Sequence, residues 1–274
     1  MRSLCLAIAT AAIALVTGAA TAQQQDPVPS TCIAMAQSLP NVVYANFTPR
    51  LAQAVAEKGE VTITYVGHST YLIDTPGGVR VATDFSGRYP VDPMPRVVTM
   101  NKAHSGHFTP SPDAAIEYPL NGWGDGTDPA RHRVVVGDLY VRNVPTDIRS
   151  WSTGGMEMNG NSIFIFEVAG LCIGHLGHLH HDLTDAHYAA IGRLDVLMVP
   201  VDGGMTQSLN NMSRIAERLY SSVILPMHRH STPMGEFLSL MGEGFAVDYR
   251  PERSFTVSLS SLPRQPTIIV LEGV

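Results

Sequence analysis

The sequence predicts an α/β fold in which mixed β-sheets are flanked by helices. Strand-like segments in the first half of the chain are separated by short turns, which is typical of antiparallel hairpins. In the second half they alternate with helix-like segments, which is typical of parallel βαβ units. With 274 residues, of which 45% are hydrophobic and 15% charged, the chain can bury the core that such a fold needs.

The expected strands share a run of β-branched or aromatic residues between turn-forming residues. They cover Val61–Tyr65, Tyr71–Asp74, Val79–Thr83, Arg96–Met100, Val134–Val136, Leu139–Asn143, Ser162–Val168, Leu171–Leu176, Asp195–Pro200 and Ser222–Leu225. The expected helices each begin at a capping residue. They run from Thr48 to Gly59, from Ser111 to Tyr118, from Thr184 to Gly192 and from Ser208 to Tyr220. Residues 119–132 are rich in glycine and aspartate and indicate an irregular loop.

Residues 1–22 have the features of a secretory signal peptide. Arg2 supplies a positive start, Leu4–Val16 is an apolar run, and Ala20-Thr-Ala22 is a cleavage signal. The alternative is an uncleaved membrane anchor, but the apolar run is shorter than the ~20 residues that a spanning helix needs. We therefore expect cleavage after Ala22, a single domain at 23–274, and a periplasmic or secreted protein without membrane contact.

Charge and cysteine content narrow the choice of partners. The formal net charge is −6, and lysine and arginine form no cluster, so nucleic-acid binding is not expected. Cleavage removes Cys5 and leaves Cys32 and Cys172. An oxidising compartment permits a disulfide between them, although Cys172 lies in a strand-like run and is as easily a small buried hydrophobe. A small-molecule partner is expected.

Eight of the eleven histidines lie in three loops that each follow an expected strand. These loops are Asn101–His107, Gly174–Asp182 and Pro226–His230. In α/β folds, the loops after the strands carry functional groups to a common edge. Imidazole is the commonest metal-binding side chain, and zinc usually takes three or four such ligands. A single histidine is more simply a surface or core residue, but the joint pattern favours a metal site.

The same loops lie in a specific order with other motifs. The motif segments are Gly67–Asp74, Val79–Gly87, Asn101–His107, Cys172–His178, Asp195–Gly204 and Leu225–His228. Together they resemble the metallo-β-lactamase-fold hydrolases, most closely the branch containing ascorbate-phosphate lactonase-like proteins. The resemblance covers about residues 61–230. It implies an αββα sandwich of two mixed sheets flanked by helices.

The chain departs from the family pattern at several ligand positions. Where the family has [ST]-H-x-H-x-D-H, Lys102 replaces the first histidine and Gly106 replaces the aspartate. The third-motif histidine is missing, and Trp151 is the best match for its position. His178 stands where the family has its bridging aspartate. A dinuclear centre of the usual kind is therefore not expected.

The resemblance nevertheless implies a metal site. Its expected ligands are His104, His107, His178 and His228, holding about one ion, with zinc first and another divalent transition metal as the alternative. Asp84 and His175 are expected to position these ligands without binding the metal themselves.

Two residues are expected to take part in catalysis. Lys102 could place a cation where a metal sits in the family, although a solvated surface lysine is as good an interpretation. Asp182 could replace the lost aspartate, as could His180 or His181 beside it. The other histidines have simpler explanations: His68 is either a supporting or a strand-edge residue, and structural roles are expected for His132, His187 and His230.

The function that this site implies is a periplasmic metal-dependent hydrolase of a small ester, lactone, amide or phosphoester. A bound metal would polarise the scissile group and activate a water molecule. The alternative is a non-catalytic metal- or ligand-binding protein on a degenerate scaffold, which the lost aspartate favours. A third hypothesis is that the histidine run at 175–181 recruits copper, nickel or iron, which imidazole also suits.

Overall fold

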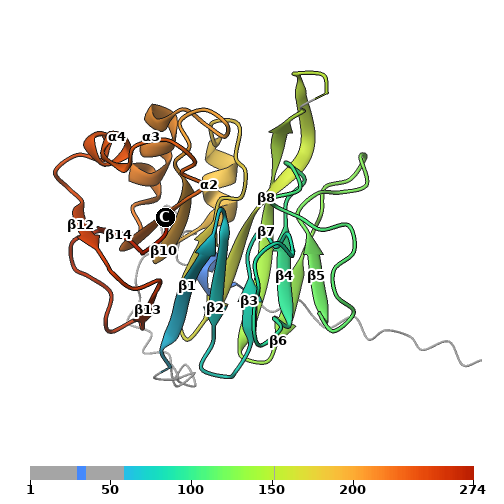
Figure 1. Ribbon diagram of the computed structural model, residues 1–274, viewed down its shortest axis with the longest axis horizontal. Helices are drawn as coiled ribbons and strands as arrows, with labels where there is room; N and C mark the ends of the chain where they lie inside the picture. The colour runs from blue at the N-terminus through green and yellow to red at the C-terminus, as the bar shows by residue number, and fades with distance from the viewer. Residues whose placement is uncertain (1–29, 35–58, 151) are drawn as a thin grey trace, which may run out of the picture.

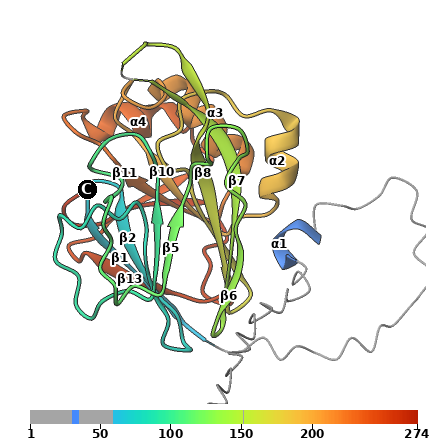
Figure 2. The ribbon, with the colours of Figure 1, turned by 90° about the vertical axis from the view of Figure 1, so that its right-hand side faces the viewer.

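Two β-sheets packed face to face form the body of the protein (Figures 1 and 2). The computed structural model describes residues 30–34, 59–150 and 152–274. One sheet has six strands in the order β13-β1-β2-β3-β4-β5, and the other has eight in the order β12-β14-β11-β10-β9-β8-β7-β6. Both sheets contain parallel and antiparallel pairs. The prediction of an α/β fold with two mixed sheets and flanking helices is confirmed.

The six-stranded sheet comprises β1 (Val61–Gly67), β2 (Thr70–Asp74), β3 (Arg80–Ala82), β4 (Val97–Met100), β5 (Tyr118–Asn121) and β13 (Ser254–Val257). The eight-stranded sheet comprises β6 (Arg133–Val136), β7 (Leu139–Arg149), β8 (Met156–Val168), β9 (Leu171–His175), β10 (Val196–Pro200), β11 (Val223–Met227), β12 (Ala246–Tyr249) and β14 (Thr267–Val270). The helices are α1 (Thr31–Ala34), α2 (Asp185–Ile191), α3 (Leu209–Leu219) and α4 (Met234–Leu240). None of these helices is long and apolar enough to cross a membrane.

The core follows from the alternation of side chains along each strand. In β8, Phe164 and Phe166 point between the two sheets, whereas Ile163 and Ile165 point to the outer face beneath the helices. The helices α2, α3 and α4 cover this outer face of the eight-stranded sheet (Figure 2). Both faces of its central strands are buried, so β9, β10 and β11 contain almost only apolar residues.

Several boundaries match the sequence prediction closely because the caps are local. Thr184 accepts the backbone N–H of His187 and begins α2, and Gly192 ends it. Ser208 begins α3 in the same way, and Tyr220 ends it with a left-handed backbone at φ 48°.

The helix predicted from Ser111 to Tyr118 is wrong. Asp113 accepts the backbone N–H of Ala115 through its side chain and that of Ile116 through its carbonyl, which makes a turn instead of a helix. The chain then continues as β5, where residues 118–121 pair in parallel with β4. The predicted signal peptide, Trp151 and all but the last residue of the helix predicted from Thr48 lie outside the described residues.

A disulfide joins Cys32 of α1 to Cys172 of β9, which answers the question that the sequence left open. Next to it, Ser30 and Thr31 donate hydrogen bonds to the carboxylate of Glu167. The same carboxylate forms a buried ion pair with Arg142 at 2.8 Å. These contacts attach a segment far from β9 in sequence to the side of the eight-stranded sheet.

Replacing Cys32 with alanine should lower the free energy of unfolding by about 2–5 kcal/mol, because the bridge closes a long loop in the unfolded chain. Urea unfolding followed by circular dichroism would measure the difference. The unsubstituted protein unfolded in the presence of a reductant is the matched control and should show the same loss. Equal stability of the oxidised protein and the alanine variant would contradict this prediction.

Candidate metal centre

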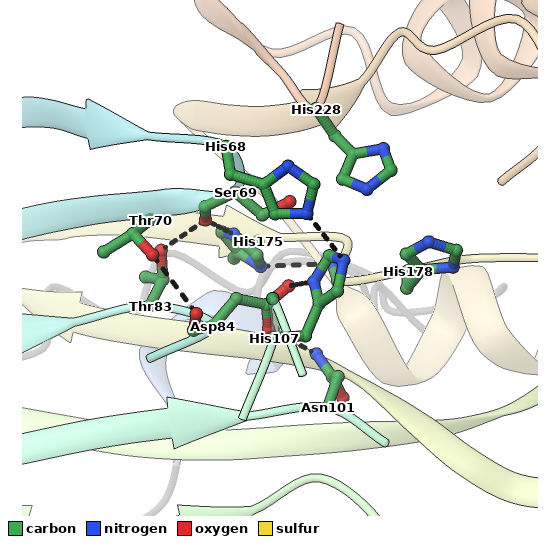
Figure 3. Close-up of polar contacts among 12 residues, drawn as sticks. His68, Ser69, Thr70, Thr83, Asp84, Asn101, His107, His175, His178 and His228 are labelled. Carbon is green, nitrogen blue, oxygen red and sulfur yellow. Dashed lines mark hydrogen bonds and ion pairs between the residues drawn. The ribbon is translucent and has the colours of Figure 1, made fainter. Parts of the chain in front are cut away.

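Five histidines from loops of both sheets meet at one edge of the sandwich. They are His68 after β1, His104 and His107 after β4, His178 after β9, and His228 after β11. Figure 3 labels His68, His107, His178 and His228 among them. The backbone N–H of His228 donates to the carbonyl of His68 at 2.8 Å, which ties the loops of the two sheets together. Four of the imidazoles line a cavity of about 420 Å³.

A buried carboxylate orients His107. Its Nδ1 lies 2.6 Å from Oδ2 of Asp84, and neither side chain is exposed (Figure 3). The amide of Asn101, at the end of β4, donates to the other oxygen of Asp84 at 2.8 Å. Burial raises the pKa of Asp84, and the neighbouring histidines and the Asn101 amide oppose this effect. With its proton on Nδ1, His107 presents the lone pair of Nε2 to the centre.

His228 is oriented in the same way from the other sheet. Its Nδ1 lies 2.7 Å from Oδ2 of Asp202. Burial alone would raise the pKa of Asp202, but hydrogen bonds from His228, Thr206 and Gly204 outweigh burial and hold that pKa well below its usual range. The Nε2 atom of His228 is buried and has no hydrogen-bond partner in the described residues. Two carboxylate–histidine pairs therefore face each other across the centre.

The Nε2 atoms converge at a spacing that suits one metal ion. That of His107 lies 3.2 Å from Nε2 of His68 and 3.2 Å from Nε2 of His104. One nitrogen from each of His68, His104, His107 and His228 lies within 4.8 Å of all the others. Two nitrogens bound tetrahedrally to zinc at ~2.0–2.1 Å are roughly 3.4 Å apart. This group contains no carboxylate, so it offers nothing to bridge a second ion.

Four of the imidazoles favour the neutral form that metal ligation needs. Burial is the main reason why the pKa values of His68, His104, His107 and His178 lie below the ordinary value, and neighbouring imidazoles add to it. The pKa of His68 falls to about 4. Low pKa values therefore favour neutral imidazoles in these four residues, each with one ring nitrogen that carries no proton.

Hydrogen bonds distinguish His104 and His178 from the other three. The backbone N–H of Gly106 donates to Nδ1 of His104, so a neutral His104 carries its proton on Nε2. His178 is buried, and its Nε2 has no partner in the described residues. Its Nδ1 lies 3.0 Å from Nε2 of His180, a nitrogen that also lies 2.8 Å from the carbonyl of Met205. Since Nδ1 of His180 accepts the N–H of Arg149, the His180 proton is on Nε2, and His178 in turn carries its own on Nε2.

The structure brings the expected metal ligands and their expected supporting residues to the same region. The structure brings His104, His107 and His228 together with His68, and places His178 next to them with ring centroids 4.6 Å from His107. Asp84 lies directly behind His107. His175 is fully buried and donates to the carbonyl of Ser69, which fixes the loop that carries His68.

The structure does not bring the two expected catalytic residues to this centre. Lys102 points away, forms an ion pair with Glu157, and lines a separate cavity with Trp123 and Asn159. Asp182 is exposed, and its backbone carbonyl accepts a hydrogen bond from Nδ1 of His181. Neither residue lines the histidine cavity, so neither is available to a substrate bound there.

His68 is the ligand candidate that the sequence analysis underestimated. Its position directly after the first strand was the available signal, because the other histidine loops also follow strands. A Cβ placed on Gly106 would lie 2.8 Å from His104 and 3.0 Å from Nε2 of His68. His68 thus occupies space that a side chain at position 106 would need. The missing side chain at position 106 therefore leaves the space in which His68 reaches the other imidazoles.

Restoring the family aspartate with Gly106→Asp should weaken metal binding by at least about 10-fold, because its Cβ displaces His68 and His104. Gly106→Ala adds only the Cβ and should cause a similar loss, which separates packing from charge. Metal affinity can be measured by competition with a chromophoric chelator. Tighter binding by the aspartate variant would contradict this account of the site.

The fold and this geometry define an α/β protein with an all-imidazole cluster, suited to a metal ion, at the edge of two sheets. The chain belongs to the metallo-β-lactamase superfamily, because residues 62–228 match the family model for the beta-lactamase superfamily domain. Among solved structures, it is similar to a protein from Thermotoga maritima proposed to be a Zn-dependent hydrolase of the metallo-β-lactamase superfamily. That protein is 26% identical, with a TM-score of 0.53 over 77% of this chain and 98% of its own.

A second similar structure is that of a proposed metal-dependent hydrolase from Parabacteroides distasonis. It is 15% identical, with a TM-score of 0.53 over 79% of this chain and 94% of its own. At this identity the likeness shows the fold alone. A comparison with curated proteins found no match.

Proposed function

We propose that this protein is a metal-dependent hydrolase that uses one ion, zinc first among the candidates, held by His68, His107 and His228, with His104 beside them. The observation that carries the proposal is the convergence of these imidazoles, two of which have a buried carboxylate on Nδ1. We place the protein in the periplasm or outside the cell after cleavage of its signal peptide. Its substrate is a small ester, lactone, amide or phosphoester, with no nucleic-acid or membrane partner.

The chain's own residues supply positioning and hydrogen bonds. Asp84 and Asp202 hold His107 and His228 in the tautomer that presents Nε2. His104 and His178 direct Nε2–H groups toward the same space, where they would stabilise an oxygen that gains negative charge in the reaction. An ion bound at this centre would polarise a scissile carbonyl or phosphoryl group and lower the pKa of a water molecule.

The alternative function, a non-catalytic metal- or ligand-binding protein, also has an observation in its favour. Among the described residues, no carboxylate lines the histidine cavity, so this part of the chain supplies no general base of the usual family type there. The two functions predict the same metal content but differ in turnover.

We expect about one tightly bound metal per chain, because the second family position lacks its ligands. Elemental analysis after dialysis against a weak chelator, on protein purified without a histidine tag, would measure metal identity and stoichiometry. The same sample would be assayed with chromogenic esters, lactones and phosphodiesters. A stoichiometry near two would contradict the single-ion site, and one metal without turnover of any substrate would favour the non-catalytic alternative.

A further inference from the structure

A second cavity adjoins the histidine cavity. It has a volume of about 220 Å³ and is lined by Tyr65, Tyr89, Arg229, Gly273 and Val274, together with His68 and His230. His68 and His230 also line the larger cavity, so the two are contiguous. A molecule whose reacting bond lies among the imidazoles can therefore extend into this second space.

Arg229 gives this cavity a cationic wall. One terminal nitrogen of its guanidinium donates to the carbonyl of Thr232 at 3.1 Å. Its Nε is buried and has no partner, and among the described residues Arg229 forms no ion pair. A partly buried guanidinium with unused donors is suited to bidentate binding of a carboxylate or phosphate.

The surroundings are also positive. Arg88 is bonded to Ser105 and acts on the nearby imidazoles, lowering the pKa values of His68 and His104 after the larger effect of burial. Arg253 donates to the carbonyl of Val66. Neither of these arginines forms an ion pair in the described part of the chain, and no aspartate or glutamate lines either cavity. A negatively charged group entering this space would be attracted by these guanidinium groups.

Two tyrosines form the remaining wall. The hydroxyl of Tyr65 donates to the carbonyl of His68, and burial raises the pKa of Tyr65 to about 12, so it stays neutral. The ring of Tyr89 packs on Gly67, where an added Cβ would lie 2.7 Å from it. Because the single O–H of Tyr65 is already donated to His68, the hydroxyl of Tyr89 is the phenol of this wall that can donate a hydrogen bond to an anion.

We propose that the cavity at Arg229 is a subsite for an anionic oxygen group, a carboxylate or phosphate carried by the substrate. The inference rests on the proposed function for the position of the reacting bond, which it places in the adjoining histidine cavity. It narrows the substrate class to small anionic molecules.

Calorimetric titration of inorganic phosphate into the metal-free protein at pH 8 tests the subsite, because no metal is then present to bind the anion. Arg229→Gln should weaken phosphate binding at least 10-fold. Arg264→Gln removes one charge from an exposed arginine and is the matched control, which should bind as the unsubstituted protein does. Tyr89→Phe changes another residue that lines this cavity and should weaken phosphate binding about three-fold. This variant provides the test if the Arg229 variant misfolds. Parallel titration with acetate distinguishes a carboxylate site from a phosphate site.

Unchanged phosphate binding by Arg229→Gln or Tyr89→Phe, or no binding at all, would overturn the proposal. Binding that requires added metal and ignores Arg229 would also overturn it, while leaving the metal centre intact. The converse result, Arg229-dependent binding in a protein that takes up no metal, would keep the subsite and remove the hydrolase proposal.

Discussion

Replacing His107 with alanine should lower metal affinity by more than about 100-fold and abolish any hydrolytic activity. Loss of an outer-shell partner typically costs 10–100-fold, and loss of a direct ligand costs more. His107 is fully buried, its Nδ1 is engaged by Asp84, and its Nε2 lies 3.2 Å from two other imidazole nitrogens. His228→Ala should behave in the same way, because its buried Nε2 has Asp202 behind it.

The measurement is metal affinity by chelator competition, with far-ultraviolet circular dichroism to verify folding. His181→Ala is the matched control, since this residue accepts the N–H of Asp147 outside the histidine cavity and should keep the metal. Asp84→Ala should fall between the two, because it leaves the ligand in place but removes the group that orients it. Full metal retention by the His107 and His228 variants would sink the metal-site interpretation.

His178→Ala separates two interpretations of the residue that stands in place of the bridging aspartate. The family alignment makes it a ligand, in which case its loss should match that of His107→Ala. The hydrogen bonds around His180 instead place the proton of His178 on Nε2 and make it a donor. We expect the variant to retain metal within about 10-fold and to lose turnover.

The structural features that could be predicted from the sequence are those that depend on residues close together in the chain. The strands β9, β10 and β11 were recognisable because each is a short apolar run between turn residues, and Thr184 and Ser208 cap their helices through contacts three residues away. The strands β12, β13 and β14 were missed. In β12, exposed and partly buried residues alternate, which leaves no apolar run to detect.

The site shows the same limit at longer range. Loops with histidines after strands could be predicted to meet, since the strand order brings their ends to one edge. The role of His68 could not, because it depends on the absence of a side chain at Gly106, 38 positions further along. The pairing of Asp202 with His228 likewise depends on β10 and β11 lying side by side in parallel register.

The metal-free protein should lose stability steeply as the pH falls from 7 to 5. The pKa values of His68 and His180 are about 4 in the folded protein, mainly because of burial, whereas an unfolded histidine titrates near 6.5. Between these values the unfolded chain binds more protons, so the stabilisation is complete above pH 6.5 and is lost toward pH 4. His107 and His178 act in the same direction, and the raised pKa of Asp84 opposes them as a single group.

Protonation of His180 should cost about 1–2 kcal/mol between pH 7 and pH 5, and that of the partly exposed His68 should cost the smaller figure. Urea unfolding of the chelator-treated protein at half-unit steps of pH would measure the total. His68→Asn cannot titrate and should flatten the curve by one group's share. His132→Asn, at a histidine that lines neither of the two adjoining cavities, is the control. Protonating buried imidazoles lowers the free energy of unfolding. If that free energy is the same from pH 8 to pH 5, the imidazoles are not buried against one another.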